Sequence, residues 1–336
     1  MIGVSLINLV SPGYVDGQPA GELLALNDHD VVVIEQRIEG RGIGDVAGIF
    51  TRMVPPNIIK AAAEGQMLGL IFFAILFGYF MTKLPVDLKD PLFRFWSATF
   101  QVMMSMTEWI MRFAPIGVFG LVAGVIAKTG FVAVRPLAIF SLTVFVALCA
   151  HALIVLPFLL RLIAKVIPLS MLKASSPALL TGFSTASSSA TLPVTMRVLE
   201  KNVGVSSGIS SFVLPLGATV NMNGTALYEC AAAMFLAQAY GLELGLGIQF
   251  TIVVVALLTS SGVAGVPSAS LVAIAIILGS IGLPIEAIGV LMVFDRLLDM
   301  CRTSVNVWGD MVCATIISRL SGEQTKIHIR LTGKDR

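Results

Sequence analysis

The chain has 336 residues, of which 56% are hydrophobic and 12% are charged, and its formal net charge is +2. Soluble globular proteins carry about 25% charged residues, so this composition excludes a soluble domain, and the small net charge gives no indication of a nucleic-acid partner. The apolar runs are long and lack the polar and apolar alternation of outer-membrane barrels. We therefore predict an all-α integral membrane protein that crosses the membrane several times.

The first part of the chain alternates between apolar and polar segments. Residues 1–13 are largely apolar but too short to cross a hydrocarbon core of about 30 Å, so we expect the end of a helix whose beginning is absent. Residues 14–60 are polar and acidic, and we expect an extracellular or periplasmic loop. Residues 61–128 are expected to form transmembrane helices, with a bend at the Ala-Pro-Ile-Gly sequence of residues 114–117.

Residues 129–321 contain apolar segments that are interrupted by polar, glycine and proline clusters. After a transmembrane helix, the segment 172–201 is broken at STASSSATLP, the segment 204–239 at NMNG and the segment 247–281 at SSGVAGVPSAS. A break within the membrane cannot face lipid, because its freed backbone groups would stay unpaired. We therefore predict two re-entrant helical hairpins, 172–201 and 247–281, in two halves of opposite orientation. Interrupted segments in matching positions indicate the binding site of a transporter.

The last apolar helix, 283–319, carries polar residues at helical spacing. They are Asp295, Asp299, Arg302, Thr303, Asn306 and Asp310. Such residues share one face of a helix, and a charge at the bilayer centre costs at least about 2.5–3.5 kcal/mol. This face must therefore meet protein, ions or water. A guanidinium suits a carboxylate and a nearby aspartate suits an ammonium, which favours an acidic amino acid as the ligand. The alternative is that Asp295, Asp299 and Arg302 pair only with one another.

Basic residues predict the orientation of the chain, because they are more frequent in cytoplasmic loops. They gather around the connections near residues 83–94, 161–173 and 197–201, and again in the tail 322–336. We predict that these parts and the C-terminus are cytoplasmic. The cysteines and histidines lack the spacing of metal ligands, so we expect no cofactor apart from a coupling cation. His151 lies in an apolar run without a catalytic motif, and we expect no enzyme activity.

Four motifs, in chain order, resemble the dicarboxylate/amino acid:cation symporters, the glutamate transporter family. They are SSSATLPVT at 187–195, NMNGTALYE at 221–229, SSGVAGVPSA at 260–269 and DRLLDMCRTSVNVWGD at 295–310. The resemblance covers nearly the whole chain, which lacks the family's first two spans and most of the third. It implies a glutamate-transporter-like fold with inverted repeats in a bacterial inner membrane, usually as a homotrimer surrounded by lipid. Residues 61–128 would belong to the scaffold, and residues 129–321 would form a transport domain that moves as an elevator.

The resemblance also implies the residues of the site. The expected substrate-binding residues are Ser188, Ser189, Thr225, Asp299, Arg302, Thr303 and Asn306. The expected sodium-binding residues are Gly217, Thr219, Asn221, Asn223, Ser260, Ser261, Val263, Asn306 and Asp310. Arg302 would bind the side-chain carboxylate of glutamate or aspartate, and Asp299 its amino group. The family usually has aspartate where this chain has Asn223, and the missing charge predicts weaker sodium binding there and favours proton coupling.

Three other functions remain open at this point. A C4-dicarboxylate carrier would leave Asp299 without an ammonium partner. An ion channel would conduct without substrate coupling. The third alternative is a truncated family member that does not transport, and the sequence upstream of Met1 would decide that question.

Overall fold

The computed structural model describes residues 1–24, 26, 54–63, 67–113, 116–117, 119–120, 123–124, 127, 134–260, 268 and 270–327. Its contacts divide the chain into two compact units. The larger unit consists of Met1–Glu39 together with Val134–Arg336, and the smaller one of Gly40–Ala133. The polar stripe lies in the larger unit.

The smaller unit is helical in its described part. Its helices are α4 (Ile58–Ala63), α5 (Met67–Met81) and α6 (Val86–Met111). Large apolar side chains lie exposed along α5 and α6, for example Phe80 at 63% and Phe95 at 60%. Helices that are apolar on every side are typical of membrane spans. Residues 114–117, where the sequence predicts a bend, follow α6 in the chain. Ala114 and Pro115 lie outside the described residues, so the bend stays a prediction.

The N-terminal segment of the larger unit combines a short helix with a small hairpin. Its elements are α1 (Ile2–Val10), β1 (Tyr14–Val15), β2 (Gln18–Pro19) and the 3₁₀ turn η1 (Glu22–Leu24). The two strands are antiparallel and joined by Asp16 and Gly17, whose φ angles are +51° and +82°. Positive φ at both positions is the geometry of the type I′ turn that Asp-Gly favours. The predicted loop 14–60 therefore begins with a hairpin, and its residues 27–53 lie outside the described part.

The helix α1 packs against α8 and α13 of the same unit. Gln238 of α13 donates to Ile7 O and accepts from Gly13 N, both at 3.2 Å. A Cβ on Gly3 would lie 2.8 Å from Leu227 O, so the two helices approach as closely as glycine permits. The first residues of the chain are thus tied to the unit that carries the polar stripe.

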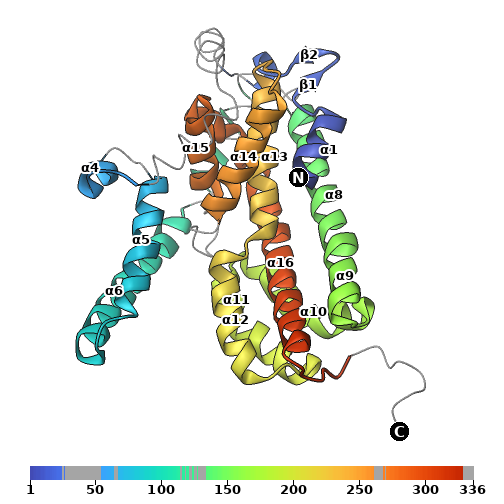
Figure 1. The fold of residues 1–336 in the computed structure, drawn as a ribbon. Helices are drawn as coiled ribbons and strands as arrows, with labels where there is room; N and C mark the ends of the chain where they lie inside the picture. The colour runs from blue at the N-terminus through green and yellow to red at the C-terminus, as the bar shows by residue number, and fades with distance from the viewer. Residues whose placement is uncertain are drawn as a thin grey trace. The chain divides into compact units, whose positions relative to one another are not determined.

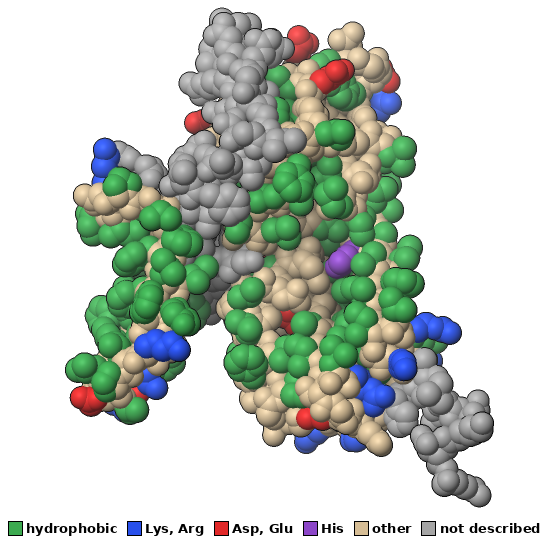
Figure 2. All heavy atoms as spheres, viewed as in Figure 1, with side chains coloured by type: hydrophobic (Ala, Val, Ile, Leu, Met, Phe, Trp, Pro, Cys, Tyr) green, Lys and Arg blue, Asp and Glu red, His purple; other side chains and the backbone are tan. Residues whose placement is uncertain are grey.

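One continuous helix of 31 residues, Val134–Ala164, is long and apolar enough to cross a membrane, judging by the described residues. It comprises α8 (Val134–Ala150), the π-helical η3 (His151–Val155), α9 (Leu156–Leu159) and the π-helical η4 (Leu160–Ala164). Figure 2 shows apolar side chains over the middle of the larger unit on the visible face, and basic side chains at its lower end. This distribution is typical of a membrane protein.

The interrupted segments form pairs of helices (Figure 1). The first pair is α10 (Pro168–Thr185) and α11 (Ser188–Val198), followed by the π-helical η5 (Leu199–Val203). The second is α12 (Ser207–Val220) and α13 (Asn223–Ala239), and the third is α14 (Leu246–Ser260) and α15 (Ser270–Ile281). The 3₁₀ turn η6 (Ile285–Ala287) leads into α16 (Ile288–Leu320). The prediction of an all-α membrane fold is confirmed, apart from the small N-terminal hairpin.

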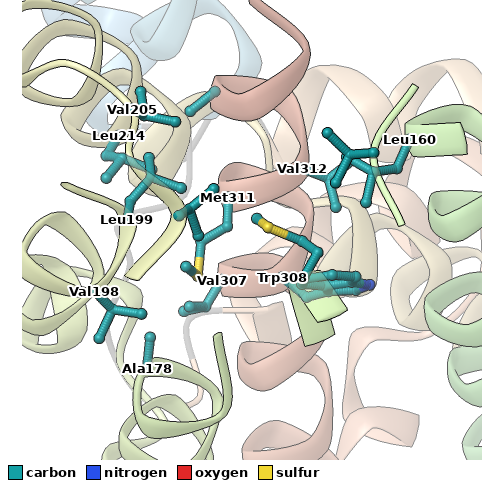
Figure 3. Packing of buried hydrophobic residues seen from close by; sticks show 14 of the residues in the cluster. Leu160, Ala178, Val198, Leu199, Val205, Leu214, Val307, Trp308, Met311 and Val312 are labelled. Carbon is teal, nitrogen blue, oxygen red and sulfur yellow. The ribbon is translucent and has the colours of Figure 1, made fainter. Parts of the chain in front are cut away.

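The core of the larger unit surrounds the second half of α16 (Figure 3). Val307, Trp308, Met311 and Val312 of α16 pack with residues of α10, α11, η5 and α12 in one apolar cluster. Trp308 is 2% exposed and donates its Nε1–H to Ala152 O at 3.0 Å. Because helices cover α16 over most of its length, its polar stripe is also enclosed by protein.

Candidate functional site

The polar stripe of α16 is buried along its whole length. Exposure is 3% for Asp295, 4% for Asp299, 1% for Arg302, 5% for Thr303, 3% for Asn306 and 4% for Asp310. These groups face other helices of the same unit and not lipid, as the cost of a charge in hydrocarbon requires. They fall into two clusters, one around Arg302 and the other around Asp310.

Arg302 lies between two aspartates of its own helix. Its Nη1 donates to Asp295 Oδ1 at 3.0 Å, and its Nε donates to Asp299 Oδ1 at 3.0 Å. Its Nη2 lies 3.0 Å from Asp299 Oδ1 but makes no hydrogen bond. Two carboxylates thus surround one guanidinium, which still has an unused donor. We call these residues, together with Tyr228, the Arg302 cluster.

Tyr228 of α13 supports the guanidinium from a second helix. The Arg302 Cζ lies 4.2 Å from the centroid of the Tyr228 ring, a cation–π arrangement. The Tyr228 hydroxyl donates to Asp295 Oδ1 at 3.2 Å. Sequence analysis gave Tyr228 no role. It placed Asp295 in the polar stripe and considered a pairing with Arg302, which the structure shows. The position of Tyr228 within the NMNGTALYE motif was the one feature of the sequence that could have pointed to a role for it.

The third helix pair, α14 and α15, contacts the cluster through a residue between its two helices. The backbone N–H of Ser268, which precedes α15, donates to Asp299 Oδ2 at 2.8 Å. Ser260, at the end of α14, is 3% exposed, and its hydroxyl donates to Leu257 O at 3.1 Å. The predicted sodium ligands Ser261 and Val263 lie outside the described residues.

Asn306 joins α16 to the start of α13. Its Oδ1 accepts from Gly224 N at 2.7 Å and from Thr225 N at 3.3 Å, and its Nδ2 donates to Thr225 Oγ1 at 2.9 Å. A Cβ on Gly224 would lie 2.7 Å from Arg302 O, so only glycine allows this approach. The structure therefore brings together two predicted substrate-binding residues, Asn306 and Thr225, at the buried N-terminus of α13, where the first backbone amides have no acceptor within the helix.

The turn of the first helix pair carries two further predicted substrate-binding residues, Ser188 and Ser189, while the last one, Thr303, lies on α16. Ser187 caps α11 by accepting from Ala190 N at 3.2 Å, and Ser188 is 5% exposed. Within the described residues, no hydrogen bond joins Ser188, Ser189 or Thr303 to the Arg302 cluster. The structure therefore does not link these three residues to the others.

Asp310 forms the centre of the second cluster. Its Oδ1 accepts from Asn221 Nδ2 at 2.9 Å, and a Cβ on Gly217 would lie 2.6 Å from the same oxygen. Asn223 packs against Gly309, and its buried Oδ1 has no hydrogen-bond partner. No lysine or arginine of the described part forms an ion pair with Asp310. We call Gly217, Asn221, Asn223 and Asp310 the Asp310 cluster.

The break between α12 and α13 supplies further oxygen atoms to this region. Asn221 and Met222 have φ and ψ angles of −97° and 58° and of −90° and 62°, so the backbone is unwound there. Gly217 O still accepts from Asn221 N at 2.9 Å, but the unwound segment does not continue the helical bonding pattern at the end of α12. Carboxylate, amide and carbonyl oxygens are the groups that bind hard cations. Thr219, a further predicted ligand, is exposed and donates to Leu216 O at 3.0 Å.

Glu229 is a buried acid whose contacts were not foreseen. It is fully buried in α13, its Oε2 accepts from Thr259 Oγ1 of α14 at 3.1 Å, and its Oε1 has no partner. The contact links α13 to the second hairpin. The spacing of residues 229 and 259 in the sequence gives no sign of it.

Comparisons with known proteins agree with the geometry. The sequence model of the sodium:dicarboxylate symporter family matches residues 1–320. The chain is 34% identical to the proton/glutamate-aspartate symporter of Escherichia coli K12 over 321 residues, which are 95% of this chain and 72% of that protein. It is 36% identical to the proton/sodium-glutamate symport protein of Geobacillus stearothermophilus, over 82% of this chain and 64% of that protein. It is 41% identical to human excitatory amino acid transporter 1, over 77% of this chain and 48% of that protein. The chain therefore spans about half to three quarters of the length of these relatives.

Proposed function

Because the chain belongs to the sodium:dicarboxylate symporter family, we propose that it couples the uptake of glutamate or aspartate to the inward flow of sodium ions or protons. Family membership makes the chain an integral membrane transporter and not an enzyme, as the sequence predicted. The substrate, the coupling ions and the assembly of the complete protein are part of the proposal.

The observation that carries the proposal is the buried Arg302 with its unused Nη2 donor beside two carboxylates. An acidic amino acid carries two carboxylates and one ammonium. Its side-chain carboxylate would accept from Arg302, and its ammonium would take the place of the guanidinium at Asp299. Asn306, Thr225 and the helix N-terminus at Gly224 would bind the main-chain carboxylate, because backbone amides there favour anions. Ser188, Ser189 and Thr303 would complete the site.

The Asp310 cluster would bind the coupling cation. Among the described residues Asp310 has no cationic partner, so a sodium ion or a proton would neutralise a charge that is costly to bury. Asn221, Asn223, Asn306 and the carbonyl of Gly217 would supply neutral oxygens. A second sodium site would involve Thr219 and Ser260, together with Ser261 and Val263. Coupling follows because the substrate adds negative charge close to Asp310, and the cation offsets it.

The remaining expectations concern the whole protein. We propose that the chain works in the bacterial inner membrane with its C-terminus in the cytoplasm, and that it assembles as a homotrimer. The smaller unit would hold the subunit contacts, and the larger unit would carry the substrate as an elevator. No organic cofactor and no nucleic acid take part in this mechanism.

The proposal is tested by reconstituting the purified protein in liposomes. Aspartate and glutamate uptake is measured with an inward sodium gradient, with an inward proton gradient and with neither. Uptake is expected to require at least one gradient, and uptake that ignores both would refute coupling. Succinate serves as the competing substrate: inhibition by succinate stronger than by unlabelled aspartate would replace the amino acid with a C4-dicarboxylate.

A further inference from the structure

Residues 321–327, which we call the C-terminal strap, directly follow α16 and cross the end of the larger unit (Figure 1). Lys326 N donates to Val203 O at 2.8 Å, and Ile167 N donates to Ile327 O at 3.4 Å. The strap thereby connects the segment before α10 with the segment before α12. These two segments flank the first helix pair on either side.

The strap needs a glycine where it crosses η5. Gly204 has a φ of +87°, and a Cβ there would lie 2.9 Å from Lys326 Cγ. The side chain of Lys326 also donates to Lys201 O at 2.6 Å. Backbone, side chain and close packing all hold the strap at this position, so it is an integral part of the unit.

Glu323 of the strap connects α12 to α16. Its Oε2 accepts from Ser206 N at 3.2 Å and from the Ser318 hydroxyl at 2.7 Å. Ser206 is the N-cap of α12, and Ser318 lies in the last turn of α16. A carboxylate at a helix N-terminus is also favoured by the helix dipole. One oxygen atom therefore sets the position of α12 along α16.

The same two helices meet again at the Asp310 cluster. Gly217 lies eleven residues, or about 16 Å, along α12 from Ser206, and Asp310 lies eight residues, or about 12 Å, along α16 from Ser318. The contact at Asp310 has little tolerance, because a Cβ on Gly217 would lie only 2.6 Å from Asp310 Oδ1. The hydrogen bond from Asn221 is 2.9 Å long and would be lost by a shift of about 1 Å.

We propose that Glu323 is a positioning residue for the cation site. It fixes the register of α12 on α16, and that register sets the distances between Asp310, Asn221 and the carbonyl of Gly217. Residues hydrogen-bonded directly to metal ligands change cation affinity by about 10- to 100-fold when they are replaced. Glu323 acts from further away, through the two helices, so we expect a shift at the lower end of this range. The inference rests on the proposed function, because it takes the Asp310 cluster as the cation site.

Trp308 lies two residues before Asp310 on α16, and its fluorescence reports changes in the packing of this helix when a cation binds. The chain has three tryptophans, so changing Trp96 and Trp109 to phenylalanine leaves Trp308 as the only one. The purified protein is titrated with sodium chloride at neutral pH, with choline chloride as the ionic-strength control. A pH titration without sodium follows protons in the same way. The fluorescence of Trp308 is expected to change with one of the two ions.

Glu323→Ala is expected to raise the cation concentration at half-saturation about tenfold. Glu323→Gln keeps an oxygen that can accept both hydrogen bonds, so its shift is expected to be smaller. Glu286→Ala, in η6 before the other end of α16, is the matched control and should leave the titration unchanged. Ser318→Ala removes one of the two hydrogen bonds and replaces Glu323→Ala if that variant does not fold.

The outcomes separate the inference from the function on which it rests. If Trp308 in the protein with Glu323 intact responds to neither sodium nor pH, the proposed cation site is wrong. If it responds, and Glu323→Ala or Ser318→Ala responds at the same concentration, the positioning role of Glu323 is overturned.

Discussion

The two clusters on α16 differ in how their charges are balanced. The Arg302 cluster contains its own counter-charge, since Arg302 contacts both Asp295 and Asp299 and stacks on Tyr228. The Asp310 cluster contains a carboxylate with amide partners and no cation from the described residues. The first arrangement suits an organic ion that exchanges partners with the protein. The second suits a small cation from solution, which would supply the counter-charge that the described residues do not.

The largest expected effect comes from breaking the balanced cluster. Arg302→Met leaves Asp295 and Asp299 buried without a cation, and removing one partner of a buried ion pair costs about 3–5 kcal/mol. The free energy of unfolding in detergent is expected to fall by that amount, and uptake of acidic amino acids to be lost. Arg296→Gln, at an exposed arginine of the same helix, is the control. Wild-type stability in Arg302→Met would contradict the balance that we describe.

At Asp310 we expect a substitution to change the free energy of unfolding in the opposite direction. Asp310→Asn removes a buried charge that has no counter-charge from the described part of the chain, and its amide oxygen can still accept from Asn221. Without sodium and at neutral pH, the free energy of unfolding is expected to rise by about 2 kcal/mol, while cation-dependent uptake is lost. Thermal unfolding with and without sodium measures both parts. If Asp310→Asn lost as much stability as Arg302→Met, the charge of Asp310 would be balanced within the protein like the charges of the Arg302 cluster.

Asn223→Asp sharpens the comparison by adding a second acid beside Asp310. The buried Asn223 Oδ1 has no partner, so a carboxylate there gains charge without losing a hydrogen bond from that oxygen. Two carboxylates attract a cation more strongly, and the sodium concentration for half-maximal uptake is expected to fall about tenfold, which corresponds to about 1.4 kcal/mol. Asn223→Ala serves as the control for side-chain loss. An unchanged sodium response would remove Asn223 from the cation site.

The smallest effect is expected at the carboxylate just beyond α16. Hydrogen bonds from Ser206 and Ser318 hold the pKa of Glu323 below its ordinary value of 4.5. A depressed folded-state pKa contributes stability above the unfolded pKa, and this contribution is lost as the pH falls through the folded value. Two cations of the described part lie close to Glu323 in the chain, namely Arg319, which donates to Glu323 O, and Lys326 of the strap.

The difference in melting temperature between wild type and Glu323→Gln is therefore expected to narrow below about pH 4.5. Scanning calorimetry between about pH 3.5 and 6 measures it. A difference that stays constant over this range would show that Glu323 does not titrate as a hydrogen-bonded acid.

Helix boundaries followed closely from the sequence. The predicted segment 247–281 corresponds to α14 and α15, which run from Leu246 to Ile281, and the NMNG break lies where α12 ends at Val220. These boundaries are local, because glycine, proline and serine clusters interrupt apolar runs at fixed positions. The start of α16 at Ile288 is later than the predicted 283, because η6 precedes it.

The sequence by itself determined that this chain is an all-α membrane protein and that the polar residues of α16 share a buried face. Hydrophobic run length and helical periodicity are properties of neighbouring residues, so they can be read along the chain. Only the tertiary structure decided which groups meet that face: Tyr228 at Asp295, Ser268 at Asp299 and Asn221 at Asp310. These partners lie 31 to 89 residues apart, and their contacts depend on how separate helices pack.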